Sequence, residues 1–278
     1  MVLEKLSLFS RIRSSKAGSW LYLVLTFLSY ALLPTGFQAI YGQFASFTQQ
    51  GHISLLFDLA WCLILTAIVW LLPPVLKKIF MLLSTAAYSL MVVASGIMLN
   101  MFNRFFSFGD FAFAGDGAAF LDLSYLNVRK ITLLLAAFCL ILMIFAVLIA
   151  PEKGRRKVKR EFLAAGVMFI IGTVLALMTK YVFLKSDNVV VWDGTYSPAE
   201  IYETFSDTKQ SMLVSGVYEY AFRDLYMTLG IFQHADPEDI QLVDDYIKSR
   251  GKHEKNDLSG IFKGKNLILI QLEAIDTW

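Results

Sequence analysis

The chain has 278 residues, of which 56% are hydrophobic, with two cysteines and a formal net charge of +2 at pH 7. Soluble domains are about 45–50% apolar, so this composition excludes an ordinary soluble domain over the whole length. Two cysteines are too few to indicate a disulfide framework or a zinc site.

The apolar residues gather in five blocks between residues 20 and 184. A helix rises about 1.5 Å per residue, so about 20 residues cross the roughly 30 Å hydrocarbon core of a bilayer. The first block begins late, lacks a small-residue cleavage site and precedes four others, which argues against a cleavable signal peptide. We therefore predict five transmembrane helices, at Trp20–Ile40, Ile53–Leu76, Ile79–Met101, Ile131–Ala150 and Phe162–Leu184.

Basic residues alternate between the segments that flank these spans. Four precede the first span, none lies in 41–52, two lie in the turn after the second span, three in 102–130 and six in 151–160. By the positive-inside rule the N-terminus is cytoplasmic, and everything after Leu184 is extracellular.

The small net charge conceals two oppositely charged parts. Residues 1–185 carry a net charge of +10 and residues 186–278 carry −8. This pattern predicts a basic membrane domain followed by an acidic, solvated region. The basic run in the loop 151–160 could suggest nucleic acid, but we interpret it as a cytoplasmic anchor on anionic lipid headgroups and expect no nucleic-acid partner.

Three side chains inside the predicted spans need an interpretation: Cys62, Cys139 and Asp58. Cys62 and Cys139 are interpreted as small buried apolar groups. Asp58 lies one turn into the second span, and an ionisable group inside a span is a functional candidate by default. The alternative, which its position near the predicted interface favours, is that Asp58 lies at headgroup depth in contact with water.

The loop at residues 102–130 is rich in phenylalanine and mixes acids, bases and glycines. Such a segment suits a surface-lying or re-entrant position, because it lacks a long apolar run. Arg104 and Lys130 are then candidates for contact with the phosphate of a substrate headgroup. An interfacial loop anchored by its aromatic residues is the alternative, and the sequence favours neither.

The predicted extracellular region continues with helices. Ser197 with Pro198 and Glu200 forms a capping-box start. Residues 211–232 are amphipathic and aromatic, which suits a helix on the membrane surface, with ordinary packing against the missing or following domain as the alternative. A further helix is expected from the cap Asp236 to Gly251, followed by a polar linker.

The final fifteen residues, "GKNLILIQLEAIDTW", contain a continuous apolar run closed by Glu273. Such a run fits a strand buried on both faces of a parallel sheet. Ligands of these sheets bind beyond the carboxyl ends of the strands, so Glu273 is a candidate ligand for a hard metal ion. A surface acid that ends a strand is the alternative.

This ending resembles the lipoteichoic acid synthase family, which are polyglycerolphosphate transferases of the alkaline phosphatase/sulfatase superfamily. The family has five spans, a helical linker and an external domain that opens like Lys265, Asn266, the apolar strand and Glu273. The stretch "SGVYEYAFRDLY" at 215–226 also resembles the family's linker. The resemblance is loose over the spans and more specific over the last fifteen residues.

The resemblance implies that Glu273 binds a catalytic manganese or magnesium ion. It also implies that a threonine attacks phosphatidylglycerol, that diacylglycerol leaves, and that glycerophosphate passes to a growing cell-wall polymer of Gram-positive bacteria. The family's nucleophile and other metal ligands lie after this point, and Thr277 does not match that nucleophile. We therefore expect the 278-residue chain to be truncated, inactive and unable to hold the ion stably.

The fold class expected is mainly α. It comprises a five-helix transmembrane bundle at 1–185, external amphipathic linker helices at 186–263 and the first strand of a truncated α/β sulfatase-like domain at 264–278. Two other functions stay open: a phosphoethanolamine transferase of the same superfamily, or a non-catalytic membrane anchor or scaffold.

Residues Leu267–Leu272 are predicted to be poorly ordered in the isolated chain. An unpaired strand leaves backbone donors and acceptors unsatisfied, at about 1–3 kcal/mol for each buried group. Residue-resolved amide hydrogen exchange should show little protection there, and strong protection in the monomer would contradict the prediction.

Overall fold

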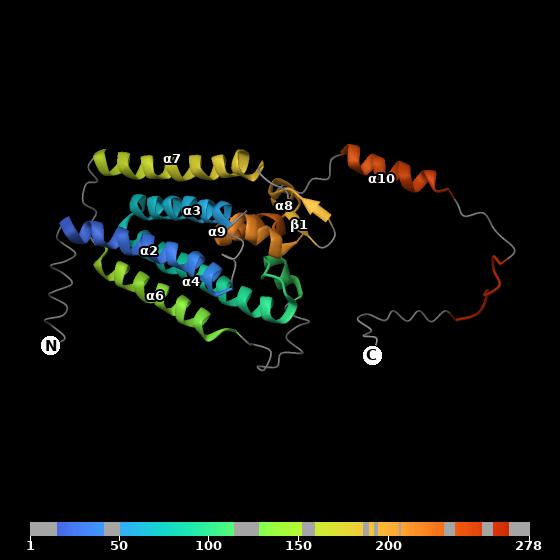
Figure 1. Cartoon of the computed structure of the whole chain (residues 1–278), viewed down its shortest axis with the longest axis horizontal. Helices are drawn as coiled ribbons and strands as arrows, with labels where there is room; N and C mark the ends of the chain where they lie inside the picture. Colours follow the sequence, from blue (N-terminus) through green and yellow to red (C-terminus); the bar gives the residue numbers. More distant parts are fainter. Residues whose placement is uncertain are drawn as a thin grey trace. The chain divides into compact units, whose positions relative to one another are not determined.

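The structure is a computed structural model that describes residues 16–41, 51–113, 128–151, 159–185, 189–191, 194–205, 207–230, 237–251 and 258–266. This described part is mainly helical (Figure 1). The chain divides into two compact units, residues 1–231 and 232–278, which are considered separately below.

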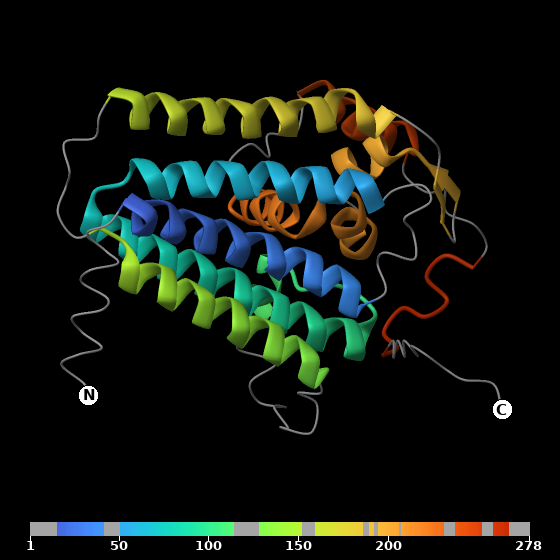
Figure 2. The ribbon, with the colours of Figure 1, turned by 60° about the vertical axis from the view of Figure 1, so that its left-hand side comes forward.

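Five helices of the first unit are long and apolar enough to cross a membrane. They are α2 (Lys16–Ile40), α3 (Gly51–Leu71), α4 (Pro74–Phe102), α6 (Lys130–Ile149) and α7 (Lys159–Tyr181). Helix α3 packs between α7 and α2, while α6 packs against α2 and α4 (Figure 2). The prediction of five spanning helices agrees with this arrangement, which is compatible with a multi-pass membrane protein.

The predicted boundary between the second and third spans is wrong. The second span was extended to Leu76, but α3 ends at Leu71 and α4 begins at Pro74. Pro73 has an extended backbone, with φ −62° and ψ 156°, and Pro74 occupies the first turn, where its missing N–H costs nothing. Lys77, predicted in a turn, is consequently a buried helical residue whose ammonium group donates to the Tyr22 hydroxyl at 3.2 Å.

Short elements follow the fifth spanning helix. They are η4 (Phe183–Lys185), the antiparallel strands β1 (Val189–Val191) and β2 (Gly194–Tyr196), α8 (Pro198–Thr204) and α9 (Thr208–Thr228). The predicted start of α8 is confirmed, because the Ser197 hydroxyl accepts a hydrogen bond from the Glu200 N–H at 3.1 Å with Pro198 in the first turn. The hairpin was not predicted.

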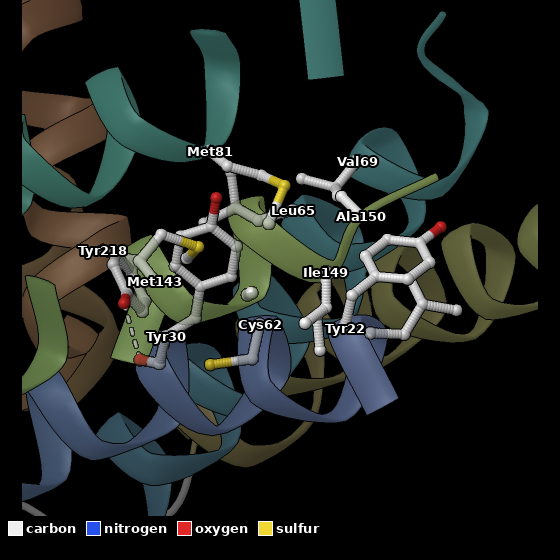
Figure 3. Packing of buried hydrophobic residues seen from close by; sticks show 12 residues of the cluster. Tyr22, Tyr30, Cys62, Leu65, Val69, Met81, Met143, Ile149, Ala150 and Tyr218 are labelled. Carbon is white, nitrogen blue, oxygen red and sulfur yellow. Dashed lines mark hydrogen bonds between the residues drawn. The ribbon is translucent and has the colours of Figure 1, made fainter. Parts of the chain in front are cut away.

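Helix α9 does not lie on the surface of the bundle, so the membrane-surface interpretation of residues 211–232 is wrong for this helix. It packs against α3 and α2, and its residues from Ser211 to Ala221 are largely buried. The ring of Tyr218 meets that of Tyr88 edge to face, with centroids 4.5 Å apart. Tyr218 also joins a cluster with Tyr30 and Cys62 (Figure 3). The alternative of packing against a missing or following domain does not describe these contacts either, because α9 packs against helices of its own unit.

The two cysteines are confirmed as buried groups of the helical core. Cys62 is in α3 with 1% of its surface exposed, and Cys139 is in α6 with 0% exposed. Both are free thiols. Each lies in a separate apolar cluster, and residues of α9 complete both clusters.

A proline in α2 creates a place for α9 to bind. Pro34 lacks an N–H, so the Tyr30 carbonyl four residues earlier has no helical donor. The Tyr218 hydroxyl donates to this carbonyl at 2.6 Å, as the dashed line in Figure 3 marks. The backbone defect of one helix is thus satisfied by a side chain of another.

The second unit contains α10 (Pro237–Ser249), as predicted, and Gly251 takes the left-handed backbone, with φ 61°, that ends a helix. Its apolar side chains Ile240, Val243, Tyr246 and Ile247 are exposed in the structure. The predicted cap Asp236, the strand Leu267–Leu272 and the metal-ligand candidate Glu273 lie outside the described residues.

Replacing Tyr218 by Phe should lower the free energy of unfolding by about 1–3 kcal/mol, because the buried Tyr30 carbonyl loses its donor. In a Pro34→Ala background the loss should be smaller, because residue 34 then supplies the helical N–H. Unfolding of the four proteins in detergent measures this coupling. Tyr246→Phe, at a side chain that is 62% exposed, is the control, and equal losses in both backgrounds would contradict the assignment.

Candidate functional site

Asp58 lies at the interface of α2, α3 and α9, with 2% of its surface exposed. Its Oδ2 atom accepts from the Gln38 side-chain amide at 2.8 Å, and its Oδ1 atom accepts from the Tyr218 N–H at 3.2 Å. The alternative of a residue in contact with water at headgroup depth is therefore wrong. A buried carboxylate is costly unless it is hydrogen-bonded, and here both oxygens have donors.

The donor from α9 is available because the helix is interrupted at Gly216. This residue has φ 75° and ψ 177°, a conformation almost restricted to glycine. The helix restarts after it, so the first N–H groups of the second segment have no intrahelical acceptor. Asp58 Oδ1 supplies the acceptor for the Tyr218 N–H.

Besides its backbone conformation, the close approach of Ser54 and Asp58 to residue 216 also requires glycine there. A Cβ atom on residue 216 would lie 2.7 Å from the Ser54 carbonyl oxygen and 2.8 Å from Asp58 Oδ1. Both distances are far inside van der Waals contact. The interruption of α9 and the burial of Asp58 therefore depend on the same missing side chain.

Glu219 forms a second polar connection between α9 and the rest of the unit. One of its oxygens accepts from the Trp61 indole N–H at 2.7 Å, and the other accepts from the Tyr202 hydroxyl. Burial, followed by the charge of Glu219, raises the pKa of Tyr202 above its usual range. The hydroxyl keeps its proton at neutral pH, so it serves as a donor and joins α8 to α9.

A small cavity of about 190 Å³ borders Asp58 between α2 and α3. Its lining is mostly apolar: Ala31, Pro34, Thr35, Leu55, Asp58, Leu59 and Cys62. Among the described residues no group of three or more His, Cys, Asp or Glu side chains could hold a metal ion. The arrangement can position α9 against α2 and α3, because the carboxyl group of Asp58 is fixed by its hydrogen bonds.

The two headgroup candidates of the 102–130 loop, Arg104 and Lys130, have different surroundings. The Arg104 guanidinium binds both oxygens of Asp110, at 2.7 and 3.0 Å. These hydrogen bonds raise the pKa of Arg104. Lys130 is exposed at the first residue of α6. The positive charge of Arg104 is already paired with Asp110.

The described part of this loop is attached to α9. It contains the short helix η2 (Phe108–Phe113). The Asp224 carboxylate accepts from the Ser107 hydroxyl at 2.7 Å and from the Phe108 N–H. Burial raises the pKa of Asp224, and these two hydrogen bonds counteract the rise. The loop segment and α9 are therefore positioned by one another.

Several residues of this site were not singled out from the sequence. They are Pro34, Gln38, Trp61 and Tyr202, besides Gly216, Tyr218 and Glu219, which appeared only inside the linker stretch 215–226. A proline inside an apolar span and a glycine inside an amphipathic helix are signals that could have indicated Pro34 and Gly216. The partners of Asp58 and Glu219 are distant in sequence and gave no local signal.

Comparison of the chain with protein-family models, with curated proteins and with solved structures finds no match. The class that the fold defines is therefore a helical protein with five helices able to cross a membrane.

Gly216→Ala should lower the free energy of unfolding by about 3 kcal/mol, because it combines a strained backbone with contact against Asp58. Gly166→Ala is the matched control: its Cβ would meet nothing within 4 Å in α7. In a helix that change should be neutral or stabilising by about 0.5–1 kcal/mol. Thermal unfolding followed by tryptophan fluorescence compares the two, and equal stability of Gly216→Ala and the parent protein would contradict the account of the interruption.

Proposed function

We propose that this chain is the membrane and linker part of a glycerophosphate transferase that builds polyglycerolphosphate from phosphatidylglycerol. The proposal places the protein in the cell membrane, with the N-terminus in the cytoplasm and the residues after α7 outside. Phosphatidylglycerol would be the donor lipid, and diacylglycerol the lipid product.

The observation that carries the proposal concerns residues 215–226, the stretch that resembles the family's linker. This stretch contains Gly216, Tyr218 and Glu219, which form the contacts of α9 with Asp58, Tyr30 and Trp61. A linker that is fixed in a five-helix bundle suits a protein whose chemistry takes place at the membrane surface. It holds the following chain close to lipid headgroups.

Chemistry in this proposal belongs to the domain that begins near Gly264. Glu273 would supply one oxygen ligand to a manganese or magnesium ion. Such ions take about six oxygen ligands, so the remaining ligands and the threonine nucleophile would come from residues after Trp278. The bound cation would lower the pKa of the nucleophile and stabilise charge on the phosphoryl oxygens.

The complete gene product, reconstituted in phosphatidylglycerol liposomes with Mn²⁺, should release diacylglycerol, measured by mass spectrometry. Chelation by EDTA should abolish release, and Glu273→Gln should reduce it at least tenfold through loss of a metal ligand. Asp245→Asn, at an exposed carboxylate of α10, is the control. Residues 1–278 alone should release none.

Diacylglycerol release by residues 1–278 alone, or release that is indifferent to Glu273, would contradict the proposal. Transfer of phosphoethanolamine in place of glycerophosphate would support the related transferase. A reading frame that ends at residue 278, with no lipid turnover, would support a scaffold.

A further inference from the structure

Two cationic side chains lie close to the ring of Tyr202, near the end of α7. The guanidinium carbon of Arg223 lies 3.7 Å from the ring centroid, and Lys180 Nζ lies 5.6 Å from the same centroid. Arg223 is in α9, Lys180 is in α7 and Tyr202 is in α8. Three helices of the first unit therefore bring two positive charges together.

Neither cation has a carboxylate in salt-bridge contact among the residues that the structure describes. The ion pairs found there are Arg104–Asp110 and Lys248–Asp245. Glu219, one turn before Arg223 on α9, uses its two oxygens to accept from Trp61 and Tyr202. An anion that reached both cations would be attracted by each of them.

The Arg223 guanidinium is held by its surroundings. It also lies 5.6 Å from the ring of Phe205, so aromatic rings of two residues restrict it. Its Nε atom is enclosed and has no hydrogen-bond partner among the described residues, whereas part of the side chain stays exposed. The terminal nitrogens carry the remaining donors. A restricted guanidinium loses little conformational entropy when it binds an oxyanion.

The position of Lys180 indicates which anion could bind near it. It is one residue from Tyr181, the last residue of a helix that can cross the membrane. Lysine and tyrosine at the end of such a helix lie at headgroup level, where the abundant anions are lipid phosphates. Arg104 differs from Arg223 here, because Asp110 already occupies its donors.

We propose that Arg223 and Lys180 bind the phosphate group of a membrane phospholipid beside Tyr202. The arginine would donate two parallel N–H bonds to two phosphate oxygens, and the lysine would act as a point charge. Free inorganic phosphate presents the same chemistry, so the test includes it. The site needs no lipid turnover, and it stands whether or not the protein is a transferase.

The test is a binding titration of the 278-residue chain in uncharged detergent. Dihexanoylphosphatidylglycerol is one probe and inorganic phosphate is the other, with binding followed by thermal shift and by native mass spectrometry. We expect saturable binding of the lipid. Arg223→Gln should raise the Kd at least tenfold, Lys180→Gln about threefold or more, and Arg223→Lys less than Arg223→Gln, since it keeps the charge and loses the two-pronged geometry.

Arg250→Gln is the matched control. Arg250 also lies over a tyrosine ring, 5.8 Å from the centroid of Tyr246, but in the second unit.

Should Arg223→Gln lose its fold, Lys180→Gln and the charge reversal Lys180→Glu carry the test. Lipid binding without phosphate binding supports the site with a lipid as its source, and binding of both supports it with free phosphate as a second source. No saturable binding of either probe, or equal Kd values for Arg223→Gln, Lys180→Gln and Arg250→Gln, overturns the proposal.

Discussion

The hydrogen bond from the Tyr218 N–H to the carboxyl group of Asp58 is the interaction on which the rest of the first unit depends. It pairs two groups that could not be buried alone: a carboxyl group inside an apolar helix, and a free N–H group where a helix restarts. Asp58 is shut off from solvent in the packed bundle, so either group would cost about 1–3 kcal/mol or more if it were unpaired. Together they hold a polar-ended helix segment among the spanning helices.

Other polar contacts follow from this one. Once α9 enters the bundle, Tyr218 reaches the Tyr30 carbonyl that Pro34 leaves without a donor, and Glu219 reaches Trp61. Each contact joins α9 to a different part of α2 or α3. On the opposite side, Asp224 holds the loop that contains η2. Helix α9 therefore connects the spanning helices with the segments beyond their ends.

The five spanning helices could be predicted because the bilayer thickness demands long apolar blocks, and the sequence supplies five. The end of the second block was misjudged because an apolar count ignores the backbone of Pro73 and Pro74. The capping pattern at Ser197 was predictable because a cap acts over three residues. The position of α9 was not, because an amphipathic helix has the same pattern on a membrane surface as in a bundle.

In the candidate site, too, features with a local sequence signal could be predicted and contacts between distant residues could not. Asp58 was noticed because an acid in a span is rare, but its donor at Tyr218 lies 160 residues later in the chain. The pairing of Arg104 with Asp110 spans only six residues, yet both residues lie in a loop that has no periodic pattern. Lys180 lies near the end of the predicted fifth span and Arg223 in the amphipathic stretch, and only the folding of α7, α8 and α9 brings them to one ring.

Residue-resolved amide hydrogen exchange of α9 in a lipid nanodisc tests the central claim most directly. The account predicts that the Tyr218 N–H group exchanges as slowly as those in the middle of α3. Asp58→Ala should accelerate its exchange while leaving α6 unchanged. Rapid exchange of this amide in the parent protein, or no response to Asp58→Ala, would contradict the claim that Asp58 holds α9 inside the bundle.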